Sequence, residues 1–266
     1  MRIFFALLLT MVFTFPPIQA RQLPLLDDIS GKSVLNQEQA RPWYGAWIGD
    51  GQSKDTWAAP YFRKQFAVTK PVSHAEVFIA VGGLYRLSLN GKRVGDHFLD
   101  PAFSRYDRRC EYVAFDVTSQ LQDGTNALGV VLGNGWYNHQ ALAVWDFEKA
   151  PWRNRPTFCL DLQILYQDGT SEMISTDLSW KTSFGAWVYN NIYTGEHYDF
   201  NLAQKGWDAA DFDDSRWHGV QYRQSPASKI IRQNMEPIRL VERINAVRCQ
   251  KINDTTYVYD FGKNMA

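Results

Sequence analysis

Two acidic residues, Glu196 and Asp199, lie close together in a segment that also contains Tyr193, His197 and Tyr198. Inverting glycoside hydrolysis needs a protonated carboxylic acid and a carboxylate, about 6.5–9.5 Å apart, with a water molecule between them. Side chains on a loop or on adjacent strands could approach that separation. Glu196 and Asp199 are therefore a candidate pair for acid–base chemistry or for sugar binding.

A second candidate site combines an amide with two aromatic rings in the segment Gly133-Asn134-Gly135-Trp136-Tyr137. One face of a sugar ring is apolar and can stack on an indole, whereas its hydroxyls need amide or carboxylate partners. The two glycines are expected to let the backbone turn and to expose Asn134. The alternative is that Trp136 and Tyr137 cap the end of a hydrophobic core.

These residues must be positioned by strands, because apolar side chains alternate with polar ones from about Tyr61 onward. The expected strands are 62–68, 75–81, 84–89 with a return at Val94, 112–117, 126–132, and 158–166 with a return at 173–174. Asn90-Gly91 is typical of a type I′ hairpin turn, and Asp168-Gly169 indicates the turn of a second hairpin. Helical patterns are limited to 33–39 and 117–121. The sequence predicts an all-β, jelly-roll-like sandwich.

The alternation stops near Tyr222 and resumes at Val241–Val247 and Thr255–Phe261. We therefore expect an N-terminal lead segment at 21–42, the sandwich at 43–222, a linker at 223–240, and the first strands of a truncated second β-sandwich at 241–266. Two strands cannot form a stable domain by themselves.

The first 20 residues are predicted to be a signal peptide, since Arg2 precedes an apolar run from Ile3 to Phe15 and a small residue at Ala20. The run is shorter than the roughly 20 residues that span a bilayer. We expect a periplasmic or secreted protein without membrane association after cleavage. An uncleaved anchor is the alternative.

Charge and cysteine content exclude other classes of protein. Lys and Arg number 28, as do Asp and Glu, so the clustered positive charge that binds nucleic acid is not expected. The cysteines, Cys110, Cys159 and Cys249, are odd in number and far apart, which argues against a disulfide scaffold or zinc site. Cys159 falls on the polar phase of its strand and is expected to be a free thiol outside the core.

Six motifs follow one another along the chain: Trp43-Tyr44-Gly45-Ala46-Trp47-Ile48, Asn90-Gly91-Lys92-Arg93-Val94-Gly95, Tyr112-Val113-Ala114-Phe115-Asp116-Val117-Thr118, Leu132-Gly133-Asn134-Gly135-Trp136-Tyr137, Gly195-Glu196-His197-Tyr198-Asp199 and Tyr259-Asp260-Phe261-Gly262-Lys263-Asn264-Met265-Ala266. In this order they resemble the N-terminal β-sandwich region of bacterial α-L-rhamnosidases, which are inverting enzymes with a helical-barrel catalytic domain.

The resemblance implies that hydrolysis is carried out by carboxylates of a helical barrel that is absent from this chain. The expected function is that of a non-catalytic, carbohydrate-associated module with rhamnose-containing glycans as partners. The alternative is an active or split α-L-rhamnosidase that is completed by a separately encoded barrel. No catalytic residue is predicted, and the segment around Glu196 is expected to have a structural or interdomain role or to bind sugar. The predicted substrate-binding residues are Asn134, Trp136, Tyr137, Glu196 and Asp199.

Some sandwiches of the resembling family bind rhamnose through calcium, which prefers six to eight oxygen ligands. Oxygen ligands could come from Asp100, Asp107, Asn134, Asn138 and Asp146. Because these residues form no compact loop, we predict no metal or other cofactor and keep calcium as the alternative.

Overall fold

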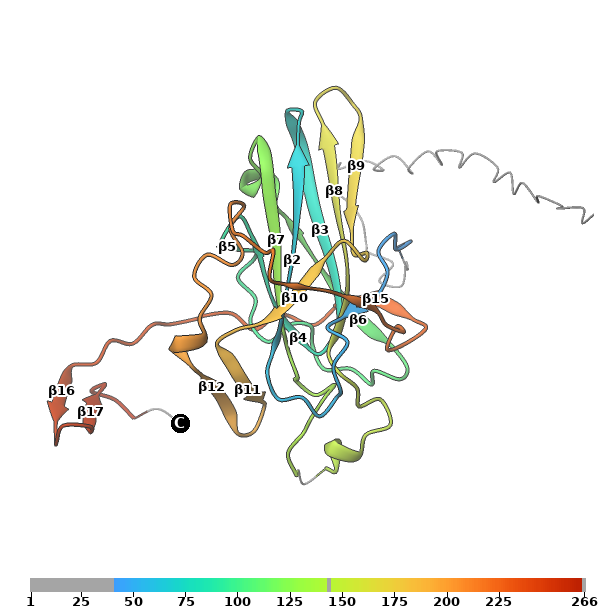
Figure 1. Ribbon diagram of the computed structural model, residues 1–266. Coiled ribbons are helices and arrows are strands. Elements are labelled where there is room, and N and C mark those ends of the chain that lie inside the picture. Colours follow the sequence, from blue (N-terminus) through green and yellow to red (C-terminus); the bar gives the residue numbers. More distant parts are fainter. Residues whose placement is uncertain (1–40, 143–144, 265–266) are drawn as a thin grey trace, which may run out of the picture. The chain divides into compact units, whose positions relative to one another are not determined.

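The alternating segments form two β-sheets in the computed structural model, which describes residues 41–142 and 145–264. The larger sheet has the strand order β14 (Gln221–Tyr222), β1 (Ile48–Gly49), β8 (Thr157–Tyr166), β3 (Val72–Gly82), β6 (Cys110–Asp116) and β15 (Ile230–Arg232), and β9 (Ser171–Ser175) also pairs with β8. The smaller sheet has the order β13 (His218–Gly219), β10 (Lys181–Phe184), β2 (Pro60–Val68), β7 (Gly124–Gly133), β4 (Leu84–Leu89) and β5 (Lys92–Arg93). The two sheets confirm the predicted all-β sandwich (Figure 1).

The core lies between the sheets and is filled by the apolar phase of the strands. Phe62 of β2, Phe158 of β8 and Trp180 are fully buried there, with ring centroids 5.0 Å apart for the first pair and 5.4 Å for the second. Leu87 and Leu89 belong to the same cluster. Since alternate residues of β4 point to opposite faces, Arg86 and Ser88 lie on the outer face of the smaller sheet.

Both predicted hairpin turns are confirmed. Asn90 and Gly91 join β4 to β5 with φ angles of 53° and 75°, which is the left-handed geometry of a type I′ turn. Gly169 follows Asp168 with a φ of 80° between β8 and β9. The turn predicted at 117–121 is a 3₁₀ helix over Thr118–Gln120, and two further 3₁₀ helices span Phe147–Lys149 and Phe200–Leu202.

The expectation that Cys159 lies outside the core is wrong, because its side chain is fully buried. The outer face of the larger sheet is covered at this point. The Cys159 thiol donates to the Gly45 carbonyl oxygen at 3.1 Å, and the neighbouring Asp161 carboxylate accepts from Arg41 Nη1 at 2.9 Å. Burial raises the pKa of Cys159 to about 12. The polar phase of β8 therefore packs against the segment that precedes β1 instead of facing solvent.

Two expectations for the C-terminal part also need correction. The expected linker at 223–240 contributes β15, which pairs in parallel with β6, and Phe98 forms a bridge with Ile238. The strand expected at 241–247 is not formed. Instead β16 (Arg248–Lys251) pairs with β17 (Tyr257–Asp260) as a separate hairpin. The strand therefore begins at Arg248, where β17 supplies a partner strand.

The predicted signal peptide and the helical pattern at 33–39 lie outside the described residues. Among the described residues, no helix has the length and apolar character needed to cross a membrane.

Candidate functional site

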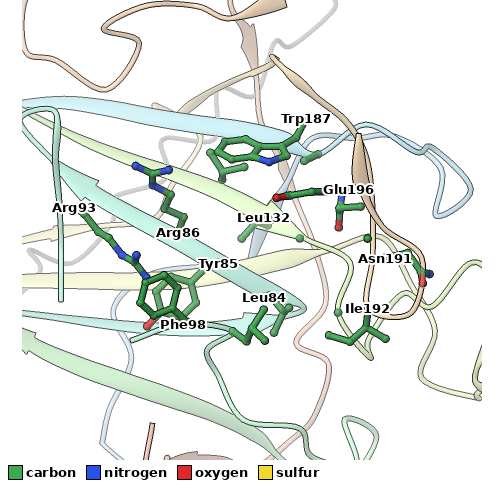
Figure 2. Close-up of a pocket in the computed structure, with 17 residues that line it drawn as sticks. Leu84, Tyr85, Arg86, Arg93, Phe98, Leu132, Trp187, Asn191, Ile192 and Glu196 are labelled. Carbon is green, nitrogen blue, oxygen red and sulfur yellow. The ribbon is translucent and has the colours of Figure 1, made fainter. Parts of the chain in front are cut away.

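A cavity of about 540 Å³ lies on the outer face of the smaller sheet, between β4 and the hairpin of β11 (Trp187–Asn191) and β12 (Gly195–Tyr198). This volume is within the usual range for small-molecule pockets. Figure 2 shows side chains from β4 and β5 on one side, and Trp187 and Glu196 of the hairpin on the other. We call this cavity the hairpin pocket.

Asn134 fixes the hairpin over the sheet. Its backbone N donates to Asn190 Oδ1 at 2.7 Å, and its side-chain Nδ2 donates to the Asn190 carbonyl oxygen at 3.0 Å. Its Oδ1 accepts from Asn138 Nδ2 at 2.9 Å. Asn134 is only 2% exposed, so the expectation that its flanking glycines expose it is wrong. Gly135 adopts a φ of 51° and lines the pocket, where a Cβ atom would lie 2.7 Å from Leu84 Cγ.

The hairpin presents an indole and two polar groups to the pocket. Trp187 lies at the start of β11, and its backbone oxygen accepts from Ala59 N at 2.9 Å. Glu196 is exposed on β12 opposite Asn190 and forms no ion pair among the described residues. Asn191 uses its Oδ1 to hold the hairpin turn, whereas its Nδ2 is buried and has no hydrogen-bond partner within the described residues. An acceptor and a donor are thus both available beside an aromatic surface.

The opposite wall consists of β4 and β5. Arg86 and Arg93 line it, together with the rings of Tyr85 and Phe98. Burial is the main factor that raises the pKa of Tyr85 well above its usual value, and the negative charge of Asp100 adds to this effect. The Tyr85 hydroxyl therefore remains protonated at neutral pH and can act as a donor.

The other predicted sugar-binding residues do not line the pocket. Trp136 lies in an aromatic cluster, with ring centroids 5.4 Å from Tyr193 and 5.0 Å from Phe147. Tyr137 is 3% exposed and packs edge-on against Tyr106, which agrees with the alternative that it caps the core.

Asp199 serves as the N-cap of the 3₁₀ helix Phe200–Leu202, where its Oδ1 accepts from Asn201 N at 2.9 Å. Glu196 and Asp199 therefore do not share the pocket, and the lining contains a single carboxylate.

The three carboxylates considered for calcium have separate partners. Asp100 Oδ2 lies 2.6 Å from His97 Nδ1, Asp107 pairs with Arg105, and Asp146 pairs with Lys149. Asn138 Nδ2 donates to Asn134 Oδ1, and the buried Asn138 Oδ1 has no hydrogen-bond partner within the described residues. Within the described part of the chain, no group of three or more His, Cys, Asp or Glu residues is arranged to hold a metal ion.

Four pocket residues, Arg86, Arg93, Trp187 and Asn191, were not predicted from the sequence. The two arginines could have been found, because a two-residue turn at Asn90-Gly91 sets Ser88 opposite Arg93 and so places Arg86 and Arg93 on one face. Trp187 and Asn191 lie about 50 residues along the chain from Gly133, and only the tertiary fold brings them to β4.

The sequence model of the α-L-rhamnosidase N-terminal domain matches residues 70–242. The chain belongs to this family. An α-L-rhamnosidase of Formosa agariphila is 37% identical over 218 residues, which are 80% of this chain and 22% of that protein. An α-L-rhamnosidase of an Alteromonas species is 32% identical over 84% of this chain and 25% of that protein.

Solved structures of α-L-rhamnosidases are similar as well. The enzyme of Dictyoglomus thermophilum superposes with a TM-score of 0.74 at 35% identity, over 84% of this chain and 26% of that one. The enzyme of Aspergillus terreus gives a TM-score of 0.74 at 31% identity, also over 84% and 26%. The α-L-rhamnosidase N-terminal domain thus accounts for most of this chain, which spans about a fifth to a quarter of the curated relatives' length.

Proposed function

We propose that this α-L-rhamnosidase N-terminal domain is a non-catalytic carbohydrate-binding module, and that its hairpin pocket holds one sugar unit of a rhamnose-containing glycan. The observation that carries the proposal is the Trp187 indole beside the Glu196 carboxylate, which has no ion pair among the described residues, and the Asn191 Nδ2, which has no hydrogen-bond partner among them. The relatives' names support the choice of glycan, and a structure of the Streptomyces avermitilis α-L-rhamnosidase is described as a complex with L-rhamnose.

The pocket lining suits the two chemical faces of such a sugar. The ring and the methyl group of a 6-deoxy sugar are apolar and fit against Trp187, Leu84 and Leu132. The hydroxyls can donate to Glu196 and accept from Asn191 Nδ2, which gives that buried amide the partner it lacks. One stacked ring with one or two hydrogen bonds is worth about 4–5 kcal/mol, so we expect a Kd nearer to millimolar than to micromolar.

Binding suits this pocket better than hydrolysis. Inverting hydrolysis uses two carboxylates on opposite sides of the scissile bond, whereas Glu196 is the one carboxylate of the lining. Asp199, the second member of the predicted pair, is occupied as a helix cap.

Ligand-observed NMR with L-rhamnose tests the proposal. We expect saturation transfer to L-rhamnose from the purified chain and its loss in Trp187→Ala. Trp145→Ala is the matched control, since Trp145 is 72% exposed and does not line the pocket. Absence of transfer from the wild-type chain, with and without calcium, contradicts the proposal, as does equal binding by a folded Trp187→Ala variant.

We also propose that the module is exported, on the basis of the apolar run and Ala20 near the N-terminus. N-terminal sequencing of the protein from its native host is expected to begin at or near Arg21. Recovery of a protein that retains Met1 from the cytosol contradicts export.

A further inference from the structure

The two arginines of the hairpin pocket lie on the same face of the smaller sheet. Ser88 pairs with Arg93 across the β4–β5 ladder, and Arg86 is two residues before Ser88 on β4. Residues two apart on a strand share a face, and such diagonal neighbours on adjacent strands have Cα atoms roughly 7–8 Å apart. Both side chains line the cavity, so their guanidinium groups can reach a common ligand (Figure 2).

Arg93 is held in a fixed orientation. Its Nη2 donates to the His97 carbonyl oxygen, and its guanidinium carbon lies 4.0 Å from the centroid of the Phe98 ring. Phe98 is itself anchored, because its backbone N donates to the Ile238 carbonyl oxygen at 2.8 Å. Since the guanidinium has five N–H donors and one interaction uses Nη2, other donors remain for a ligand.

Neither arginine has an acidic partner. Among the described residues, no Asp or Glu forms an ion pair with Arg86 or Arg93. The nearby acids are engaged elsewhere: Asp100 lies against His97, and Asp96 pairs with Arg239. Asp208 packs beside Gly129 on the same face without an ion pair to either arginine.

The charge of the pocket is therefore uneven, with two unpaired cations at the β4–β5 end and the single carboxylate of Glu196 on the hairpin. Like charges on neighbouring strands repel each other, and a bound anion relieves that repulsion. Guanidinium groups also match the geometry of carboxylate and sulfate oxygens. A neutral sugar would leave both cations without a counterion.

We propose that Arg86 and Arg93 bind the carboxylate or sulfate group of an acidic sugar, so that the ligand of the hairpin pocket is a negatively charged glycan unit. This inference rests on the proposed sugar-binding function and narrows its ligand class. Trp187, Asn191 and Glu196 contact the sugar ring and its hydroxyls, and the two arginines bind the negatively charged group of the sugar.

The test compares acidic ligands with neutral counterparts that contain the same sugars. Isothermal titration or NMR titration of the full chain uses a disaccharide of L-rhamnose and galacturonic acid against its methyl ester, and L-rhamnose 3-sulfate against L-rhamnose. We expect at least about tenfold tighter binding of one acidic ligand than of its neutral counterpart, since charge-assisted hydrogen bonds exceed neutral ones. Comparison of the two ligand pairs shows whether the arginines prefer a carboxylate or a sulfate group.

Variants assign the effect to the two arginines. Arg86→Gln and Arg93→Gln are each expected to reduce the ratio of the neutral to the acidic ligand's Kd about threefold or more. Arg108→Gln is the matched control, because Arg108 is exposed and lies outside the pocket lining. Preserved acidic preference in both folded pocket variants overturns the inference.

The outcomes separate this inference from the proposed function. If the neutral and the acidic member of both pairs bind equally, the acidic inference fails and sugar binding stands. If no ligand of either pair binds, both fail. If the neutral members bind, the acidic members bind more tightly and the arginine variants remove that difference, both are supported.

Discussion

The segment Gly133–Tyr137 and the hairpin β11–β12 both carry amide and aromatic side chains, but they use them in opposite ways. In the first segment, Asn134 and Tyr137 are 2% and 3% exposed, and the Asn134 amide is fully engaged with its neighbours. In the hairpin, Glu196 is exposed and Asn191 Nδ2 has no partner within the described residues. Residue types alone therefore do not separate the buried segment from the hairpin, whereas burial and hydrogen bonding do.

The two regions also depend on each other. Asn134 holds Asn190, and Asn190 lies opposite Glu196 on the hairpin. The buried segment is thus the support of the hairpin, which we propose as the contact surface. Substitutions in the supporting segment should have a larger effect on stability than on binding. Substitutions in the contact surface should have a larger effect on binding than on stability.

The largest expected effect comes from Tyr137→Ala in the support. The Tyr137 ring packs 5.1 Å from Tyr106 and against Gly82, and burial raises its pKa well above the usual value. Removing a buried aromatic side chain should lower the free energy of unfolding by about 3–5 kcal/mol, measured by urea denaturation. Trp187→Ala should cost less stability but abolish sugar binding. Equal stability of Tyr137→Ala and the wild type contradicts the supporting role of Tyr137.

Asn134→Ala should give the next largest effect. The variant loses the donor to the Asn190 carbonyl and the acceptor for Asn138, which should reduce the free energy of unfolding by about 1–3 kcal/mol. Because the backbone bond from Asn134 N remains, we expect a loosened hairpin instead of a lost one. Faster hydrogen exchange of the β11–β12 amides, measured by NMR, checks this.

Asn134→Asp is the informative companion variant. It keeps an oxygen for Asn138 but removes the donor to the Asn190 carbonyl. Its exchange rates should resemble those of Asn134→Ala in the hairpin. Unchanged hairpin exchange in both variants contradicts the supporting role of Asn134.

The sandwich could be predicted from the sequence because its strands and turns are indicated by patterns within short segments of the chain. Period-two alternation marks β2, β3, β7 and β8, and the Asn90-Gly91 turn fixes the register of β4 and β5. Cys159 was misplaced because alternation shows which side chains share a face but not whether a distant segment covers that face. The hairpin pocket could not be predicted in the same way, because it lies between β4 and the distant hairpin β11–β12. The Asn134–Asn190 contact helps to hold that hairpin in place, and no local sequence pattern indicates this contact.

Glu196→Gln should have a smaller effect, confined to the contact surface. The exposed Glu196 has no ion pair among the described residues, so stability should change by less than about 0.5 kcal/mol. The amide keeps one acceptor oxygen but loses the charge and the second acceptor oxygen, which should weaken sugar binding several-fold. Neither the wild type nor the variant should hydrolyse an aryl α-L-rhamnoside. Turnover by the wild type that disappears in Glu196→Gln contradicts the non-catalytic proposal.

A pH-dependent effect separates the buried carboxylate of Glu111 from the exposed one of Glu196. Glu111 is 2% exposed, its Oε2 lacks a hydrogen-bond partner, and Arg109 Nε lies 3.7 Å from its Oε1. Burial raises the pKa of Glu111 above its usual value, and the Arg109 charge only partly opposes this. The folded state then binds this proton more tightly than the unfolded state does. Its contribution to stability is fully present below the unfolded pKa of about 4.3 and is lost as the pH rises through the folded pKa.

Replacing Glu111 with Gln removes this titration. Glu111→Gln should therefore gain stability relative to the wild type as the pH rises from about 4 to 7, by on the order of 1 kcal/mol or less, because one unpaired buried oxygen is involved. Urea denaturation of Glu196→Gln over the same pH range is the comparison, since that side chain is exposed. A parallel pH dependence in the two variants would mean that burial does not distinguish these carboxylates, and the contrast between the supporting core and the contact surface would lose its electrostatic basis.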